Sequence, residues 1–301
     1  PINSGNPQLS CLNGDIGAVE EYIFESLPIQ LLGVPPITGW QFTWDNCCRN
    51  AAITNITLPS SAGFTLRASM FPFIDPSTGV AIPADPCFDS SPEFKEQPKT
   101  ILCTGFPFSY SHNAADEELD ELVYSWGEPL DDFLTVYNPP VDPAPLTYVA
   151  PYSITNPLPG NPTLNSSTGE IAYDANISGN FVTCVKVQAW KCNQLVSEIY
   201  REVQVVLINC LPMPGTSIPN NPPTVEAPFL DSITNLPSFD TTVYAGSLVE
   251  FNISGIDADL YGGTIPQELT MEVSGGQFAD DFLTTSMCLN PPCATFNNAA
   301  G

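Results

Sequence analysis

Residues 179–210 read GNFVTCVKVQAWKCNQLVSEIYREVQVVLINC. Apolar and polar side chains alternate along 181–189, and the alternation resumes along 195–207 after the short polar segment 191–194. A period of two with many β-branched residues is typical of a β-strand with one buried face. Two such runs joined by a short polar loop predict an antiparallel hairpin, with one face buried and the other in water.

The hairpin also predicts which side chains lie inside. A lone hairpin is not stable in water, so it must pack on another sheet, and we expect a β-sandwich. The predicted buried face consists of Phe181, Val185, Val187, Ala189, Leu195, Ile199, Val203, Val205 and Leu207. The predicted water-facing side carries Lys186, Gln188, Glu198, Glu202 and Gln204.

Composition narrows both the fold class and the partners. The chain of 301 residues has 33 acidic and only 7 basic residues, with a formal net charge of −26. Nucleic acids and anionic membranes both attract Lys and Arg, so neither is expected as a partner. The 32 prolines and 20 glycines suit all-β domains with many turns. The sequence contains no stretch of about 18 apolar residues, so it predicts no membrane span.

The length accommodates two or three domains of sandwich size. We expect an Ig-like β-sandwich, complete or partial, at 1–90, an Ig- or cadherin-like sandwich at 91–211 and a third such domain at 212–301. The fold class is therefore all-β, with tandem antiparallel sandwiches. The third domain has too few strand-like segments to close, so we expect it to be truncated or completed by a neighbour. The chain begins at Pro1, and we expect it to be a piece of a longer protein.

Ten cysteines in an acidic, β-rich chain indicate structural disulfides in an oxidising compartment, because their spacing does not fit a zinc site. Cys47 and Cys48 are adjacent, and neighbours on a strand point to opposite sides, so we expect each to bond a different partner, with Cys11 and Cys87 the nearest candidates. Connectivity is otherwise open. The remaining candidates are Cys103, Cys184 and Cys210 in the second domain, and the local pair Cys288 and Cys293.

Several segments together resemble one protein family. They read WDNCCRNAAITNI at 44–56, CTGFPFSYSHNAADEELDELVYS at 103–125, REVQVVLINC at 201–210 and VYAGSLVEFNISGID at 243–257. This order resembles large multidomain surface proteins of Bacteroidota that are exported by the type 9 secretion system and carry Ig- or cadherin-like repeats. Such proteins are often labelled gliding-motility-associated. The resemblance implies an extracellular adhesin or a structural part of a surface filament.

One acidic segment is a candidate metal site. Asp116, Glu118 and Asp120 alternate, so on an extended or looped backbone their carboxylates project to one side, and such hard oxygen ligands suit Ca²⁺. The resemblance implies a cadherin-like Asp-x-Asp-x-Asp calcium motif, although here the middle acid is Glu118 and Leu119 takes the place of glycine. Asp257 and Asp259 repeat the pattern more weakly. The alternative is a solvated acidic turn.

We expect that this protein is not an enzyme. His112 follows Ser111, but neighbours on a strand point apart, and no Gly-x-Ser-x-Gly elbow is present. The four tryptophans suit sandwich cores or a sugar-stacking platform, with Trp190 the best candidate for exposure. They are Trp40, Trp44, Trp126 and Trp190.

The expected function is that of a structural or adhesive segment of a large extracellular surface protein or filamentous appendage, located at the cell surface. The alternatives are a calcium-assisted carbohydrate-binding module and an accessory domain of a secreted enzyme. The expected partners are neighbouring copies or domains of the same protein, with homo-oligomers left open, and a surface ligand of unidentified chemistry. We expect no nucleic acid and no membrane span.

Overall fold

The computed structural model describes residues 22–82, 90–95, 98, 100–131, 144–209, 223–244, 247–261 and 265–266. Across these residues the chain is β-strand and turn, apart from one turn of 3-10 helix, η2 (Pro59–Ser61). The all-β prediction is confirmed, whereas the arrangement as tandem repeats stays a prediction. The chain divides into two compact units, Pro1–Gly33 and Val34–Gly301. In the first unit only 22–33 is described, and it contains no strand.

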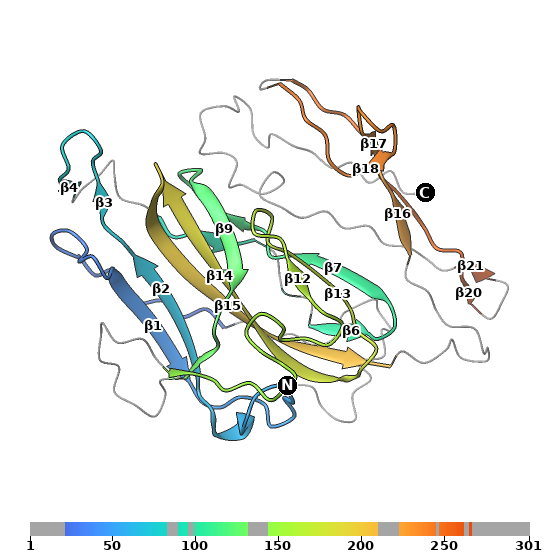
Figure 1. Ribbon diagram of the computed structural model, residues 1–301, viewed down its shortest axis with the longest axis horizontal. Coiled ribbons are helices and arrows are strands. Elements are labelled where there is room, and N and C mark those ends of the chain that lie inside the picture. Colours follow the sequence, from blue (N-terminus) through green and yellow to red (C-terminus); the bar gives the residue numbers. More distant parts are fainter. Residues whose placement is uncertain are drawn as a thin grey trace. The chain divides into compact units, whose positions relative to one another are not determined.

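The predicted hairpin forms the centre of the second unit (Figure 1). β14 (Gly179–Lys191) pairs antiparallel with β15 (Gln194–Ile208), and the register places Phe181 opposite Val205 and Val187 opposite Ile199. Cys192 and Asn193 turn the chain with φ angles of 49° and 61°. Two successive left-handed residues make the tight turn whose twist matches that of paired strands. A register shift at Ala189/Trp190 interrupts the ladder near this turn.

The hairpin belongs to an eight-stranded sheet. Its main path is β11-β10-β2-β15-β14-β9, and in addition β1 pairs with β2 and β6 pairs with β15. All of these pairs are antiparallel except β6 with β15, which is parallel. The other strands are β1 (Trp40–Asn46), β2 (Phe64–Met70), β6 (Ile101–Cys103), β9 (Glu121–Trp126), β10 (Leu130–Asp131) and β11 (Ala144–Pro145).

A second, three-stranded sheet packs on one face of the hairpin and closes the sandwich. It has the order β12 (Thr163–Leu164), β13 (Glu170–Asp174), β7 (Pro107–Ser111). Shorter pairs are β3 (Phe73–Ile74) with β4 (Ala81–Ile82), and β5 (Glu93–Phe94) with β8 (Ala114–Ala115).

The main core lies on the face of the hairpin that the alternation predicts. Each large apolar side chain buried there contributes about 1.5–3 kcal/mol. The core comprises Tyr124, Leu158, Ile171, Tyr173, Ala175, Phe181, Val185, Val187, Val203, Val205 and Leu207, with Ile199 packed against it.

The opposite face of the hairpin differs from the prediction, because it is covered rather than wet. Cys184 is 3% exposed and Glu198 is 7% exposed. Val182 packs with Ile53 and Ile56 in a second cluster on this side, against Leu146 and Tyr148. The covering segments are far from the hairpin in sequence, so the alternation within 179–210 contains no sign of them.

The eight-stranded sheet takes β1 and β2 from before residue 90, and β6, β9, β10, β11, β14 and β15 from after residue 91. Strand pairing therefore crosses the expected boundary between the first two domains, and the division into three domains stays a prediction. Farther along the chain, three two-stranded pairs follow. They are β16 (Thr224–Glu226) with β19 (Ser254–Ile256), β17 (Phe229–Leu230) with β18 (Pro237–Ser238), and β20 (Leu260–Tyr261) with β21 (Ile265–Pro266).

Candidate functional site

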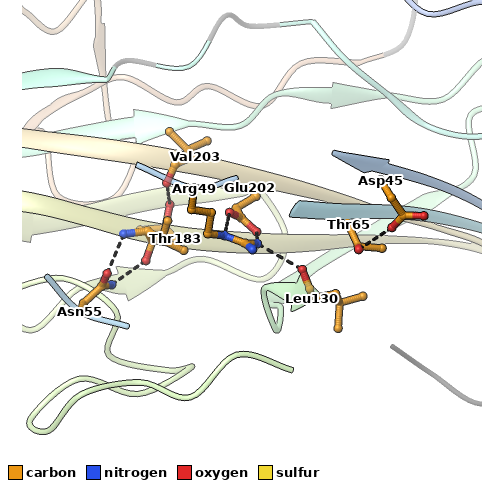
Figure 2. A network of polar contacts seen from close by, with 9 residues as sticks. Asp45, Arg49, Asn55, Thr65, Leu130, Thr183, Glu202 and Val203 are labelled. Atoms are coloured by element: carbon orange, nitrogen blue, oxygen red, sulfur yellow. Dashed lines mark hydrogen bonds and ion pairs between the residues drawn. The ribbon is translucent and has the colours of Figure 1, made fainter. Parts of the chain in front are cut away.

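The segment 44–56, which carries part of the family resemblance, contains a buried ion pair. Arg49 donates from Nε to Oε1 of Glu202 at 2.9 Å and from Nη2 to Oε2 at 2.6 Å. Nη2 also donates to the carbonyl of Leu130 at 3.2 Å. The side chains of Arg49 and Glu202 are only 2% and 3% exposed. Figure 2 shows the guanidinium of Arg49 lying against the carboxylate of Glu202, on β15. A two-pronged pair of this kind is both strong and directional.

Local contacts hold Arg49 in place. β1 ends at Asn46, whose Oδ1 accepts a hydrogen bond from the backbone N–H of Cys47 at 2.8 Å. The backbone N–H of Arg49 then donates to the carbonyl of Ala62, and its guanidinium lies 5.3 Å from the centre of the Phe64 ring. Burial raises the pKa of Glu202, and the hydrogen bonds and charge of Arg49 offset part of this rise.

Asn55 is a second anchor in the same segment, and it is fully buried. Its Nδ2 donates to the carbonyls of Pro157 and Val182 at 2.8 Å each, and its Oδ1 accepts the backbone N–H of Val182 at 2.9 Å. Thus the amide completes main-chain hydrogen bonding beside β14 (Figure 2). The segment 44–56 is fastened to the sheet through its most buried polar side chains.

An open pocket of about 360 Å³ lies next to this ion pair. It is formed by the end of β1, the loop that follows it, the start of β2, the first part of β14 and the second half of β15. The lining residues are Trp44, Asn46, Cys47, Cys48, Arg49, Asn50, Ile53, Phe64, Val182, Glu202 and Gln204.

The cysteines correct two predictions. Cys47 and Cys48 are bonded to each other rather than to separate partners. The prediction placed both on a strand, but β1 ends one residue earlier, so the alternation of a strand does not apply to them. Cys184, a disulfide candidate, is a free and buried thiol, and burial raises its pKa well above the ordinary value.

Two other cysteines lie at exposed positions. Cys103 is disulfide-bonded, and its partner lies outside the described residues. Cys192 is a free thiol in the turn of the hairpin. Five candidates lie outside the part of the chain that the structure describes: Cys11, Cys87, Cys210, Cys288 and Cys293.

The acidic segment forms a tight turn. Oδ1 of Asp116 accepts the backbone N–H groups of Glu118 and Asp120 at 3.1 and 2.9 Å. Leu119 adopts a left-handed φ of 61°, a conformation that favours glycine. Asp116 is 8% exposed, its Oδ2 is buried without a hydrogen-bond partner, and burial raises its pKa.

The other acids of this turn have partners of their own. Glu118 accepts the backbone N–H and the hydroxyl of Ser90, and Oδ2 of Asp120 lies 3.1 Å from Nζ of Lys191. The described residues contain no group of three or more His, Cys, Asp or Glu side chains arranged to hold a metal ion. The structure therefore brings Asp116 and Asp120 into one turn, while Glu118 binds elsewhere.

The second acidic pair forms a smaller version of this turn. The backbone N–H of Asp259 donates to Oδ1 of Asp257 at 2.8 Å, directly after β19. Both side chains are half-buried.

Ser111 and His112 do not form a nucleophile–base pair. The hydroxyl of Ser111 donates to the carbonyl of Thr168, and neither ring nitrogen of His112 has a hydrogen-bond partner. His112 is 1% exposed and lies edge-on to the rings of Phe94 and Tyr110. Burial, followed by the charge of Arg201, lowers its pKa to about 3, so the imidazole is neutral.

The four tryptophans are all half-buried, including Trp190, the best candidate for exposure. Trp126 packs against the main core, as expected of a sandwich. Trp44 lines the pocket and meets Phe64 edge-on, with ring centres 5.9 Å apart.

The basic side chains are used internally. Of the seven in the sequence, Lys99 lies outside the described residues, and the other six all have partners. Five contact carboxylates: Arg49 with Glu202, Arg67 and Lys186 with Glu198, Lys95 with Glu93, and Lys191 with Asp120. Arg201 lies over the ring of Phe94 and donates to Tyr110 and to the carbonyl of His112.

Comparison with known proteins gives no assignment: no protein-family model matches the chain, and no curated protein does. None of the helical structure in the described residues is long and apolar enough to cross a membrane.

Sequence reasoning missed Arg49, Asn55 and Glu202 as the centre of this region. One signal was available: Arg49 is among the few basic residues of a very acidic chain, which indicates a specific carboxylate partner.

Proposed function

We propose that this chain is a structural and adhesive segment of a large extracellular surface protein or filamentous appendage, of the type exported by the type 9 secretion system of Bacteroidota. The all-β fold, the large negative charge and the family resemblance support this proposal. Its partners are neighbouring copies or domains of the same protein and a ligand on the contacted surface. Its location is the cell surface.

One observation carries the proposal. In segment 44–56, one of those that carry the resemblance, the buried polar groups bind the fold itself: Arg49 binds Glu202, and Asn55 binds Val182 and Pro157. Buried groups that bind the fold hold a scaffold in shape, whereas a catalytic group must reach a substrate. The segment is accordingly a device for stiffness, which suits a shaft that bears load.

Surface labelling tests the location and the role. Antibodies against the purified segment should label intact cells of the source organism, and the free segment should compete with those cells for attachment to their natural surface. Labelling that requires permeabilised cells would refute the proposal. Surface labelling without any competition would remove the adhesive part and leave the structural part.

We further propose that the Asp116 turn binds Ca²⁺. Asp116 presents a buried carboxylate oxygen without a partner, and a cation would compensate its charge. The carboxylates of Asp116 and Asp120 would hold the ion, and water and backbone carbonyls commonly complete such a shell. Lys191 already neutralises Asp120, so calcium competes with this ammonium group. When bound, the ion would stiffen the turn.

Thermal melting with calcium and with a chelator tests the metal. At a calcium concentration 100 times the Kd, the gain is about 2.7 kcal/mol, which corresponds to roughly 5–11 °C for a domain of this size. Asp116→Asn should abolish the shift, while Asp257→Asn reports separately on the second turn. A melting temperature that calcium and chelator leave unchanged would refute the metal.

A further inference from the structure

We propose that the pocket beside the Cys47–Cys48 disulfide binds an uncharged saccharide. This site rests on the adhesive part of the proposed function and deepens it, because it gives the surface ligand a chemical class. The pocket has a volume of about 360 Å³ and opens to solvent. This volume lies at the lower end of the range of about 300–1,000 Å³ that is usual for small-molecule sites. It therefore suits a short saccharide, or the terminal sugar of a longer glycan.

The charge of the lining selects a neutral ligand. Among the described residues that line it, only Arg49 and Glu202 carry charges, and they neutralise each other. Both carboxylate oxygens of Glu202 accept hydrogen bonds from Arg49, which leaves no free carboxylate to attract a cation. The guanidinium is balanced by the same contact, so an anion gains little. A locally neutral surface is unusual in a chain with a net charge of −26.

Side-chain amides supply the polar contacts. The Oδ1 atoms of Asn46 and Asn50 accept the backbone N–H groups of Cys47 and Ala52, and within the described part of the chain neither Nδ2 group donates to another residue. Gln204 donates through Nε2 to Asn180, and its Oε1 remains an acceptor. Uncharged donors and acceptors side by side match the hydroxyl groups of a sugar, each of which both donates and accepts.

An aromatic wall supplies the apolar contact. Trp44, at the end of β1, lines the pocket together with Phe64 of β2, and the two rings meet edge-on. An aromatic face buries a large area with little loss of side-chain entropy and packs well against C–H groups. One face of a pyranose ring presents such groups, while its rim presents hydroxyls. Amides and aromatic rings are therefore placed for the two kinds of surface that a sugar offers.

Titration calorimetry on the whole chain tests the site. The probes are the methyl glycosides of glucose, galactose, mannose and N-acetylglucosamine, with galacturonic acid and N-acetylneuraminic acid as charged probes. We expect at least one neutral glycoside to bind more tightly than either acid. Trp44→Ala should weaken this binding by about tenfold or more, as for a central aromatic contact. Trp40→Ala is the matched control, because Trp40 lies on the same strand, is also half-buried and is not part of the lining.

Asn50→Ala keeps the test decisive if Trp44→Ala does not fold. Asn50 is exposed, so the substitution removes a polar group of the lining at little cost to folding, and we expect it to weaken binding severalfold. The proposal is overturned if none of the neutral glycosides binds, if an acidic sugar binds more tightly, or if both variants bind like the unaltered chain. Such a failure leaves the structural role intact, because surface labelling tests that role independently.

Discussion

Replacing Arg49 by leucine should destabilise the fold more than any other change of a single charged residue in the described sheet. The substitution removes three hydrogen bonds, two to Glu202 and one to the carbonyl of Leu130. It leaves the carboxylate of Glu202, 3% exposed, without its partner. Losing one partner of a buried pair costs about 3–5 kcal/mol, which lowers the melting temperature by roughly 6–20 °C.

The penalty of Arg49→Leu depends on pH with a definite sign. Burial raises the pKa of Glu202, and Arg49 opposes this rise, so the variant has a still higher pKa at this position. Between the pKa of this carboxyl in the unfolded chain and its higher pKa in the folded variant, the folded variant keeps a proton that the unfolded chain has lost. The stability of the variant therefore falls as the pH rises through this interval. The loss of stability is therefore largest at neutral pH, and it becomes smaller as the pH is lowered toward the ordinary pKa of a glutamic acid.

Urea unfolding measures this effect, provided that the slope m stays constant between variants. Arg49→Leu combined with Glu202→Leu should recover most of the loss, because an apolar pair can replace a buried ion pair without leaving a charge. Lys95→Leu is the control: it breaks an ion pair with Glu93, which is 72% exposed, and the loss of that pair should cost at most about 1 kcal/mol. The reasoning is wrong if Arg49→Leu costs no more than the control, or if the double variant is no more stable than the single one.

Three further predictions concern other groups. Burial lowers the pKa of His112 to about 3, so below about pH 6.5 the unfolded chain takes up a proton that the folded protein does not, and the free energy of unfolding falls by about 1.4 kcal/mol per pH unit. His112→Phe should remove this part of the loss. Equal slopes of stability against pH for both proteins would contradict the prediction. Leu119→Gly should stabilise by about 0.5–1 kcal/mol in urea unfolding, since its φ is 61°, while Leu119→Ala should gain nothing. Peptide mapping after alkylation of the native protein should show that Cys192 is labelled and that Cys184 is protected until the protein unfolds. It should also show a Cys103–Cys210 disulfide, because Cys103 lies opposite Ile208, which precedes Cys210 by two positions. Label on Cys184 in the native protein, or a disulfide from Cys103 to another cysteine, would contradict this prediction.

The sequence predicts the hairpin well because its physics is local. Alternation reveals which side chains share a face, and Phe181, Val185, Val203 and Leu207 all lie in the core on the expected side. The acidic turn is likewise visible, since Asp116 caps its own loop within four residues. Both features depend on neighbours in the chain, so a pattern of a few residues contains the necessary information.

Contacts between distant segments escape such patterns. Glu202 looks like a water-facing residue of a strand, and only the approach of Arg49, 153 positions earlier, buries it. Asn55 resembles a loop residue until Pro157 and Val182 surround it. The Cys47–Cys48 pairing depended on where β1 ends, and a strand boundary is hard to place from sequence. The candidate pocket combines the first and the third of these contributions, the Arg49–Glu202 pair and the Cys47–Cys48 pair, which is why no single motif predicts it.

The structural and ligand-binding proposals share an electrostatic cause. Five of the six described cations contact carboxylates within the fold. The net charge of −26 makes two such chains, or this chain and an anionic cell surface, repel each other at long range. Salt at physiological strength confines this repulsion to about 8 Å. Adhesion must then come from contacts made at short range, by packing and uncharged hydrogen bonds. The pocket beside Trp44 offers those contacts at a place where Arg49 and Glu202 cancel each other, so a neutral sugar is a ligand that this acidic molecule approaches without an electrostatic penalty.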